Sequence, residues 1–146
     1  IFYSYNENME TKVNATDFGW GVGMALVAGL VGPFVLWPIE MVLPMPVVVE
    51  ESYKAWLVWL VLRSRPSKPI FWVIATSLGF GISETMLYLV NFIQSGDWGS
   101  WGLRLVTTVP MHVGTMVIQY WGWLGGWGPL GIIPAILGHQ WFNSNI

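Results

Sequence analysis

The sequence predicts an all-α protein, a polytopic bundle of about five transmembrane helices, on the basis of its composition and its length. Hydrophobic residues make up 54% of the 146 residues and charged residues only 10%, whereas soluble domains carry about 25% charged residues. The mean hydropathy is +0.55, and the apolar residues fall in long stretches with few charges. Because about 20 apolar residues cross a bilayer as a helix, a chain of this length has room for about five such helices.

The transmembrane stretches are separated by glycine, proline and charged residues. Pro46 suits the first turn of the second helix, because a backbone N–H at that position would have no partner within the helix and proline lacks one. The chain is expected to break repeatedly after the first stretch, at Pro33, Pro38, Pro44 and Pro46. Glu40 falls in this broken stretch, most simply at the membrane surface. The five predicted spans cover residues 18–36, 47–62, 70–93, 103–123 and 130–142.

The chain divides into a polar N-terminal segment, residues 1–17, and a single transmembrane domain, residues 18–146. Arg63, Arg65 and Lys68 form the densest positive cluster of the sequence. The positive-inside rule predicts that this loop is cytoplasmic, which places the N-terminus inside and the C-terminus outside. We therefore expect an integral, multi-pass membrane protein whose first partner is the lipid bilayer.

Charge and cysteine content exclude several classes of function. The formal net charge is −2 and no basic patch is visible, which argues against a nucleic-acid partner. The chain has no cysteine, so a disulfide framework, a thiolate metal site and a cysteine nucleophile are all excluded. No Gly-x-Ser-x-Gly elbow occurs that would present a serine nucleophile.

A small set of polar residues interrupts the predicted spans. A charge near the bilayer centre costs about 2.5–3.5 kcal/mol on insertion scales, so such residues usually face a protein-lined cavity and have a function. Neighbouring helix positions three or four residues apart share a face, which groups Glu50 with Lys54 and His139 with Asn143. Phe80 and Tyr88, four residues to either side of Glu84, are expected to be packing residues. The candidate site consists of Glu50, Glu51, Lys54, Glu84, His112, His139 and Asn143.

Carboxylates, imidazoles and an amide in one pocket suit hydrolysis by an activated water. One carboxylate can take a proton from the water as general base, and a second acid can hold the water or protonate the leaving amine. Imidazole and amide groups can donate to the oxyanion that forms. Two histidines and one glutamate would also suit zinc with an open position. Because His-Glu-x-x-His is absent, we expect no cofactor and keep metal-assisted chemistry as the alternative.

The order of these residues on successive helices resembles the PrsW-type intramembrane proteases. The resemblance rests on Glu50-Glu51-x-x-Lys54, Phe80-x-x-x-Glu84-x-x-x-Tyr88, a lone His112 and His139-x-x-x-Asn143, and it covers about residues 46–143. These proteases are grouped with type II CAAX prenyl endopeptidases and CPBP proteins in one superfamily. A glutamate at position 84 favours PrsW, since CAAX-type members usually carry histidine there. The chain departs from the PrsW pattern in having fewer predicted helices.

The resemblance implies a role for each residue and a class of substrate. Glu50 or Glu51 would activate the water, with Glu50 preferred, and Lys54 would orient the pair. Glu84 would share the water or relay protons. His139 and Asn143 would form an oxyanion hole, with His112 nearby. The substrate would be a membrane protein or a lipid-anchored peptide.

Two other functions are compatible with the sequence. The same superfamily includes the scaffold subunit of gamma-secretase, so the chain is alternatively a non-catalytic subunit of a larger membrane complex. Intramembrane glutamate and histidine residues also build proton or ion pathways. The charged residues of the second helix, close to Pro46, would in the simplest case only cap a short helix at the membrane surface.

Overall fold

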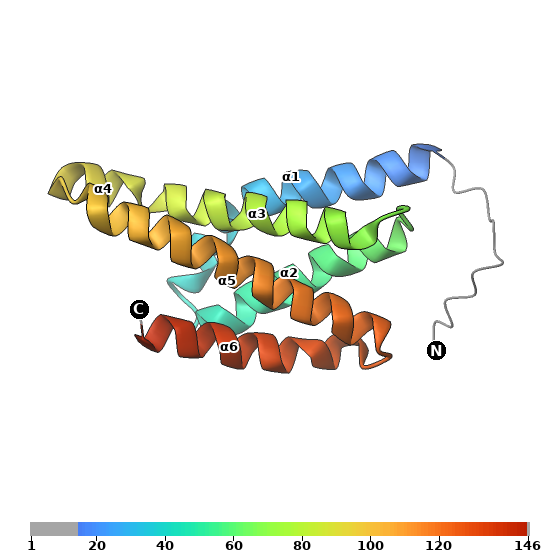
Figure 1. The fold of residues 1–146 in the computed structure, drawn as a ribbon. Helices are drawn as coiled ribbons and strands as arrows, with labels where there is room; N and C mark the ends of the chain where they lie inside the picture. The colour runs from blue at the N-terminus through green and yellow to red at the C-terminus, as the bar shows by residue number, and fades with distance from the viewer. Residues whose placement is uncertain (1–14, 146) are drawn as a thin grey trace.

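The computed structural model is built of helices (Figure 1). It describes residues 15–145, except for the side chains of residues 15–18, 20 and 21. No strand occurs within residues 15–145, so the predicted all-α bundle is confirmed. Most of the predicted polar segment 1–17 lies outside the described residues. The elements are α1 (Ala15–Glu40), α2 (Pro46–Arg63), α3 (Pro69–Leu87), α4 (Leu89–Ser95), α5 (Trp98–Leu124), the 3-10 helix η1 (Gly128–Gly131) and α6 (Ile132–Asn145).

Proline has two different effects in this chain. Pro46 is the first residue of α2, as predicted, and Pro69 likewise begins α3. The prediction that Pro33 and Pro38 break the chain is wrong, because α1 continues through both. Membrane helices tolerate internal proline where neighbouring helices and local adjustments satisfy the freed backbone groups. As a result α1 reaches Glu40 as one helix of 26 residues.

The later spans differ from their predicted bounds in detail. The third span is divided at Tyr88 into α3 and the seven-residue α4. The predicted loop at residues 94–102 is short, because α5 already begins at Trp98. Asp97 caps that helix by accepting a hydrogen bond from the Ser100 backbone N–H at 3.0 Å. The fifth span begins as a 3-10 turn before α6.

Two helices in the middle of the bundle connect its outer layers. In Figure 1, α1 runs beside α3 on one side and α6 lies on the other, with α2 and α5 crossing between them. The buried core joins these central helices to α3 through large apolar side chains. Its fully buried members include Leu57, Val58, Val61, Val73, Phe80 and Met116.

Glycines let two pairs of helices approach closely. A Cβ at Gly29 would meet the Thr76 carbonyl oxygen at 2.8 Å, so α1 and α3 require glycine there. A Cβ at Gly81 would lie 3.1 Å from the Val109 Cα, which brings α3 and α5 together. Such small residues are typical of helix pairs in membranes.

Two helical segments of the described part of the chain are long and apolar enough to cross a membrane. They are Val22–Glu40, with a mean hydropathy of 2.0, and Pro69–Ser95, with 1.5. Much of their apolar surface faces outward, including Phe34, Trp37 and Phe71. Helix α6 has 14 residues and is about 21 Å long at 1.5 Å per residue, short of the roughly 30 Å of a hydrocarbon core. The number of spans therefore stays a prediction.

Candidate active site

Helix α2 presents three of its four charged residues, Glu50, Glu51 and Lys54, to the interior of the bundle, whereas Arg63 at its end is exposed. Glu51 and Lys54 have no exposed surface, and Glu50 is 8% exposed. The Lys54 Nζ atom lies 2.6 Å from Glu50 Oε1 and 2.7 Å from Glu51 Oε1. The one-turn spacing of these residues places the ammonium group against both carboxylates. The alternative of a surface cap does not apply, because a cap at the surface would be exposed.

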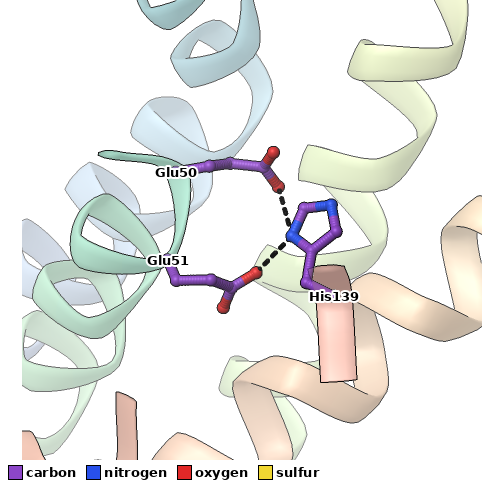
Figure 2. Close-up of side chains that lie close together, drawn as sticks. All are labelled: Glu50, Glu51 and His139. Carbon is purple, nitrogen blue, oxygen red and sulfur yellow. Dashed lines mark hydrogen bonds and ion pairs between the residues drawn. The ribbon is translucent and has the colours of Figure 1, made fainter. Parts of the chain in front are cut away.

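Glu51 is held by contacts from two further helices. Gln119 of α5 donates from Nε2 to Glu51 Oε2 at 2.7 Å and to the Glu51 carbonyl oxygen at 3.3 Å. His139 of α6 places its Nδ1 atom 2.7 Å from Glu51 Oε1 (Figure 2). Both carboxylate oxygens are therefore engaged. A carboxylate with this many partners in a closed site is fixed in one orientation.

Glu50 lies between the two histidines of the chain. Its Oε1 atom is 3.2 Å from His112 Nδ1 and 3.7 Å from His139 Nδ1. Figure 2 shows His139 pointing between the ends of Glu50 and Glu51. The two imidazole rings are perpendicular, with centroids 5.6 Å apart. Helices α2, α5 and α6 thus meet at the Glu50 carboxylate.

His112 joins Glu50 to Glu84 of α3. Its Nε2 atom contacts Glu84 Oε2, while its Nδ1 atom faces Glu50. An imidazole that meets a carboxylate at each nitrogen is best satisfied as imidazolium, which donates at both. Counting Glu50, Glu51 and Glu84 against two cations, Lys54 and Arg104, leaves one negative charge. A proton on His112 would balance it.

Arg104 of α5 completes the surroundings of Glu84. Its Nη2 atom lies 3.5 Å from Glu84 Oε1, and its guanidinium group stacks 3.8 Å from the centre of the Tyr88 ring. Phe80, one turn before Glu84, is buried and lies 5.3 Å from the His112 ring between centroids. Tyr88 and Phe80 thus pack against the charged groups of the site.

A small cavity opens beside the cluster. It has about 20 Å³ available to water, and Glu40, Glu50 and Glu84 contribute carboxylates to its wall. Aromatic rings form much of the remainder. A volume of this size holds about one water molecule, and an ordered water needs two to four polar partners. The carboxylates of Glu50 and Glu84 supply such partners.

The structure brings six of the seven predicted site residues together. They are Glu50, Glu51, Lys54, Glu84, His112 and His139. Asn143 is not among them: its side chain is exposed on α6, and no described hydrogen bond joins it to the cluster. Its predicted role therefore has no geometric support.

Four residues at the site were not predicted from the sequence. Arg104, Gln119 and Glu40 contact the cluster or its cavity, and Thr115 lies 3.5 Å from Lys54 Nζ. Thr115 and Gln119 follow His112 by three and seven residues, and these spacings repeat on one helix face. That periodicity was the available signal. Arg104 could have been noticed as a lone cation at the start of its span.

Two groups of side chains have the donor atoms that metal ions bind. The carboxylates of Glu50 and Glu84 with His112 form one group, and the carboxylates of Glu50 and Glu51 with His139 form the other. Within each group, the ligand atoms lie within 4.8 Å of one another. Lys54 Nζ already contacts both carboxylates of the second group.

The helical bundle and this buried cluster agree with what a comparison of the sequence with protein families finds. Neither the curated proteins nor the solved structures contain a match to the chain. The family model described as PrsW family intramembrane metalloprotease matches residues 10–144. This match confirms the PrsW part of the resemblance, while the wider CAAX and CPBP superfamily stays a prediction. The chain belongs to the PrsW family of intramembrane metalloproteases.

Proposed function

We propose that this intramembrane protease hydrolyses a peptide bond of a membrane protein or lipid-anchored peptide with a water held between Glu50 and Glu84. One observation carries the proposal: these two carboxylates, from different helices, line a cavity large enough for water. The cavity lies directly against the buried charge cluster. A general base must lie within hydrogen-bond reach of the proton that it takes. A water in this cavity would lie next to the carboxylates of Glu50 and Glu84.

Glu50 is the better candidate for the general base. The described contacts of Glu50 all involve Oε1, whereas both oxygens of Glu51 are engaged by Lys54, Gln119 and His139. Glu50 also lines the cavity. We therefore assign proton abstraction to Glu50 and a positioning role to Glu51.

The proposed reaction needs no covalent intermediate. Water attacks the scissile carbonyl carbon as Glu50 takes its proton, the carbonyl oxygen becomes an oxyanion, and the C–N bond then breaks. The proton held by Glu50 passes to the leaving nitrogen, so that a carboxyl group and an amine result. An imidazole can stabilise the oxyanion by donating a hydrogen bond to it, and His139, whose Nδ1 atom contacts Glu51, is the candidate for that role. Asn143 has no part in this proposal, because it is exposed.

The family description names a metalloprotease, whereas from the sequence we expected no cofactor and kept metal-assisted chemistry as the alternative. The donor set of Glu50, Glu84 and His112 fits a divalent ion, because two carboxylates and an imidazole are ligands of catalytic zinc. These three residues would hold the ion once His112 has lost a proton, because only a neutral imidazole can ligate a metal. When bound, it would supply Lewis-acid polarisation of the substrate carbonyl. Lys54 holds Glu50 and Glu51 in place in either case.

The test is hydrolysis of quenched fluorogenic transmembrane peptides in proteoliposomes. We expect wild-type protein to cleave members of a panel with varied central sequences, and Glu50→Gln to lower kcat by about 10²–10⁴-fold. The control is Asp97→Asn, which also replaces one carboxylate by an amide. Asp97 is exposed, and asparagine caps helices as well as aspartate does.

Three results would count against this proposal. Full activity of Glu50→Gln would exclude Glu50 as the base. Equal losses in Glu50→Gln and Asp97→Asn would indicate a general effect of charge removal. A wild-type protein that cleaves no peptide and copurifies with other subunits would favour the scaffold function.

A further inference from the structure

Most of the charge cluster is sealed from its surroundings. Glu51, Lys54 and His112 have no exposed surface, and His139 is 2% exposed. The side chains of Glu50 and Glu84 retain 10% and 16% exposure. Glu50 and Glu84 are therefore the carboxylates of the cluster that water can reach, and both line the cavity.

A third carboxylate, Glu40, lies on that same side. Glu40 is the last residue of α1, and no other charged residue occurs between positions 18 and 40. Its side chain is partly exposed and also lines the cavity. It therefore reaches both the surface of the molecule and the space next to Glu50 and Glu84. No described hydrogen bond joins Glu40 to the cluster itself.

The rest of the cavity wall has few groups that bind water. Trp37, Phe80 and Leu87 are among its other lining residues. Apolar cavities stay dry, whereas a water is held where it has two to four polar partners. Glu50 and Glu84 supply two carboxylates, and Glu40 supplies the third. Without Glu40, the wall apart from Glu50 and Glu84 would consist of proline, leucine and aromatic side chains, of which Tyr88 carries a hydroxyl.

We propose that this cavity is the route by which water reaches Glu50 and Glu84, and that Glu40 is a positioning residue that keeps water within it. The part of this inference that concerns turnover rests on the proposed peptide hydrolysis, since that reaction consumes the water. The water route itself depends only on the geometry of the cavity.

The first test compares Glu40→Leu with Glu40→Gln in the proteoliposome assay, with Asp97→Asn as the matched control. Leucine removes both charge and hydrogen bonding, so we expect kcat to fall about 10-fold or more with KM changed less than about twofold. Glutamine still binds water through its amide, so it should recover most of the lost kcat. A Glu40→Leu variant within twofold of wild type would overturn the positioning role, as would a loss that appears mainly in KM.

The second test needs no peptide hydrolysis. The chain has no native cysteine, so Leu87→Cys places a single thiol in the cavity wall and widens the cavity. We would measure its reaction rates with cationic 2-aminoethyl methanethiosulfonate and neutral methyl methanethiosulfonate. Both reagents react with thiolates, which form where water reaches the thiol. If Glu40 lies beside the route, adding Glu40→Gln should lower the cationic-to-neutral rate ratio about threefold or more, while adding Asp97→Asn should not.

The two tests separate failure of the route from failure of the protease function. If wild type cleaves no peptide but the rate ratio depends on Glu40, the water route stands and the proposed function fails. If wild type is active and the ratio is the same with and without Glu40→Gln, the positioning role of Glu40 fails alone. A thiol at position 87 that reacts with neither reagent would overturn the route.

Discussion

Replacing Lys54 by methionine removes the ammonium group that contacts both Glu50 and Glu51 while nearly preserving side-chain length. Lys54 Nζ lies 2.6 and 2.7 Å from the two Oε1 atoms, and Lys54 and Glu51 have no exposed surface. Removing one partner from a buried ion pair typically costs about 3–5 kcal/mol, because an uncompensated charge stays behind. We therefore expect Lys54→Met to lower the free energy of unfolding by that amount.

A double-mutant cycle separates the ion pair from the loss of packing. Glu51→Gln removes one of the two charges that Lys54 balances, so Lys54→Met combined with Glu51→Gln leaves Glu50 as the one carboxylate facing the methionine. We expect the pair to show a coupling free energy of at least about 1.5 kcal/mol, with the double variant more stable than the sum of the single losses predicts. The Glu51→Gln side chain can still accept a hydrogen bond from Gln119.

The assay is unfolding in mixed micelles by SDS, followed by tryptophan fluorescence, for which the chain offers 11 tryptophans. The control is Asp97→Asn, which changes an exposed charge. The proposed role of Lys54 would be refuted if Lys54→Met lost less than about 0.5 kcal/mol, the usual range for surface substitutions. Strict additivity in the cycle would show that Lys54 and Glu51 do not stabilise each other.

Two further predictions concern the position of His112 and the metal. A Cβ at Gly81 would lie 3.0 Å from His112 Cδ2 and 3.1 Å from the Val109 Cα, so Gly81→Ala should displace the ring and lower kcat by about 10²-fold. Gly114→Ala on the same helix as His112 meets nothing within 4 Å and is the control; equal activities of the two variants would contradict the prediction. Zinc titrated calorimetrically into metal-depleted protein should bind saturably, and Glu84→Gln should weaken that binding by about tenfold or more. Absence of saturable binding, with activity that resists chelators, would instead favour carboxylate chemistry alone.

The positions of charged residues made most of the site predictable. Glu50, Glu51 and Lys54 interrupt a stretch that otherwise reads as a membrane helix, and the high cost of burying a charge in a bilayer means that such residues rarely occur without a partner. Spacing along one helix then predicted the contact of Lys54 with Glu50, whereas a role of Lys54 toward both glutamates was implied only by the PrsW resemblance. Glu84 and His112 followed by the same reasoning, although the sequence could not show that His112 contacts Glu84 and faces Glu50.

Neutral polar residues at the site could not be predicted in the same way. Gln119 and Thr115 are uncharged, so burying them costs less than burying a charge, and their presence in a predicted span is a weaker signal of a site. Their contacts with Glu51 and Lys54 depend on how α2 crosses α5. A crossing angle follows from the packing of whole helix faces, which a single sequence does not specify. The same limit applies to Asn143. Its spacing from His139 predicted a shared helix face, but could not show that His139 is buried while Asn143 is exposed.

The location of Glu40 depended on how proline acts in a membrane helix. In water, proline breaks helices because it lacks the N–H that would donate to the carbonyl one turn earlier and because its ring clashes with that carbonyl. On that rule, Glu40 was predicted to lie in a broken stretch at the membrane surface. Since α1 continues through Pro33 and Pro38, Glu40 instead lies at the end of a helix packed against α3, and the chain reverses within residues 41–45 to begin α2. That reversal brings Glu40 to the same cavity as Glu50, ten positions later. Glu40 was therefore left out of the predicted site because a rule for proline in water was applied to a membrane helix.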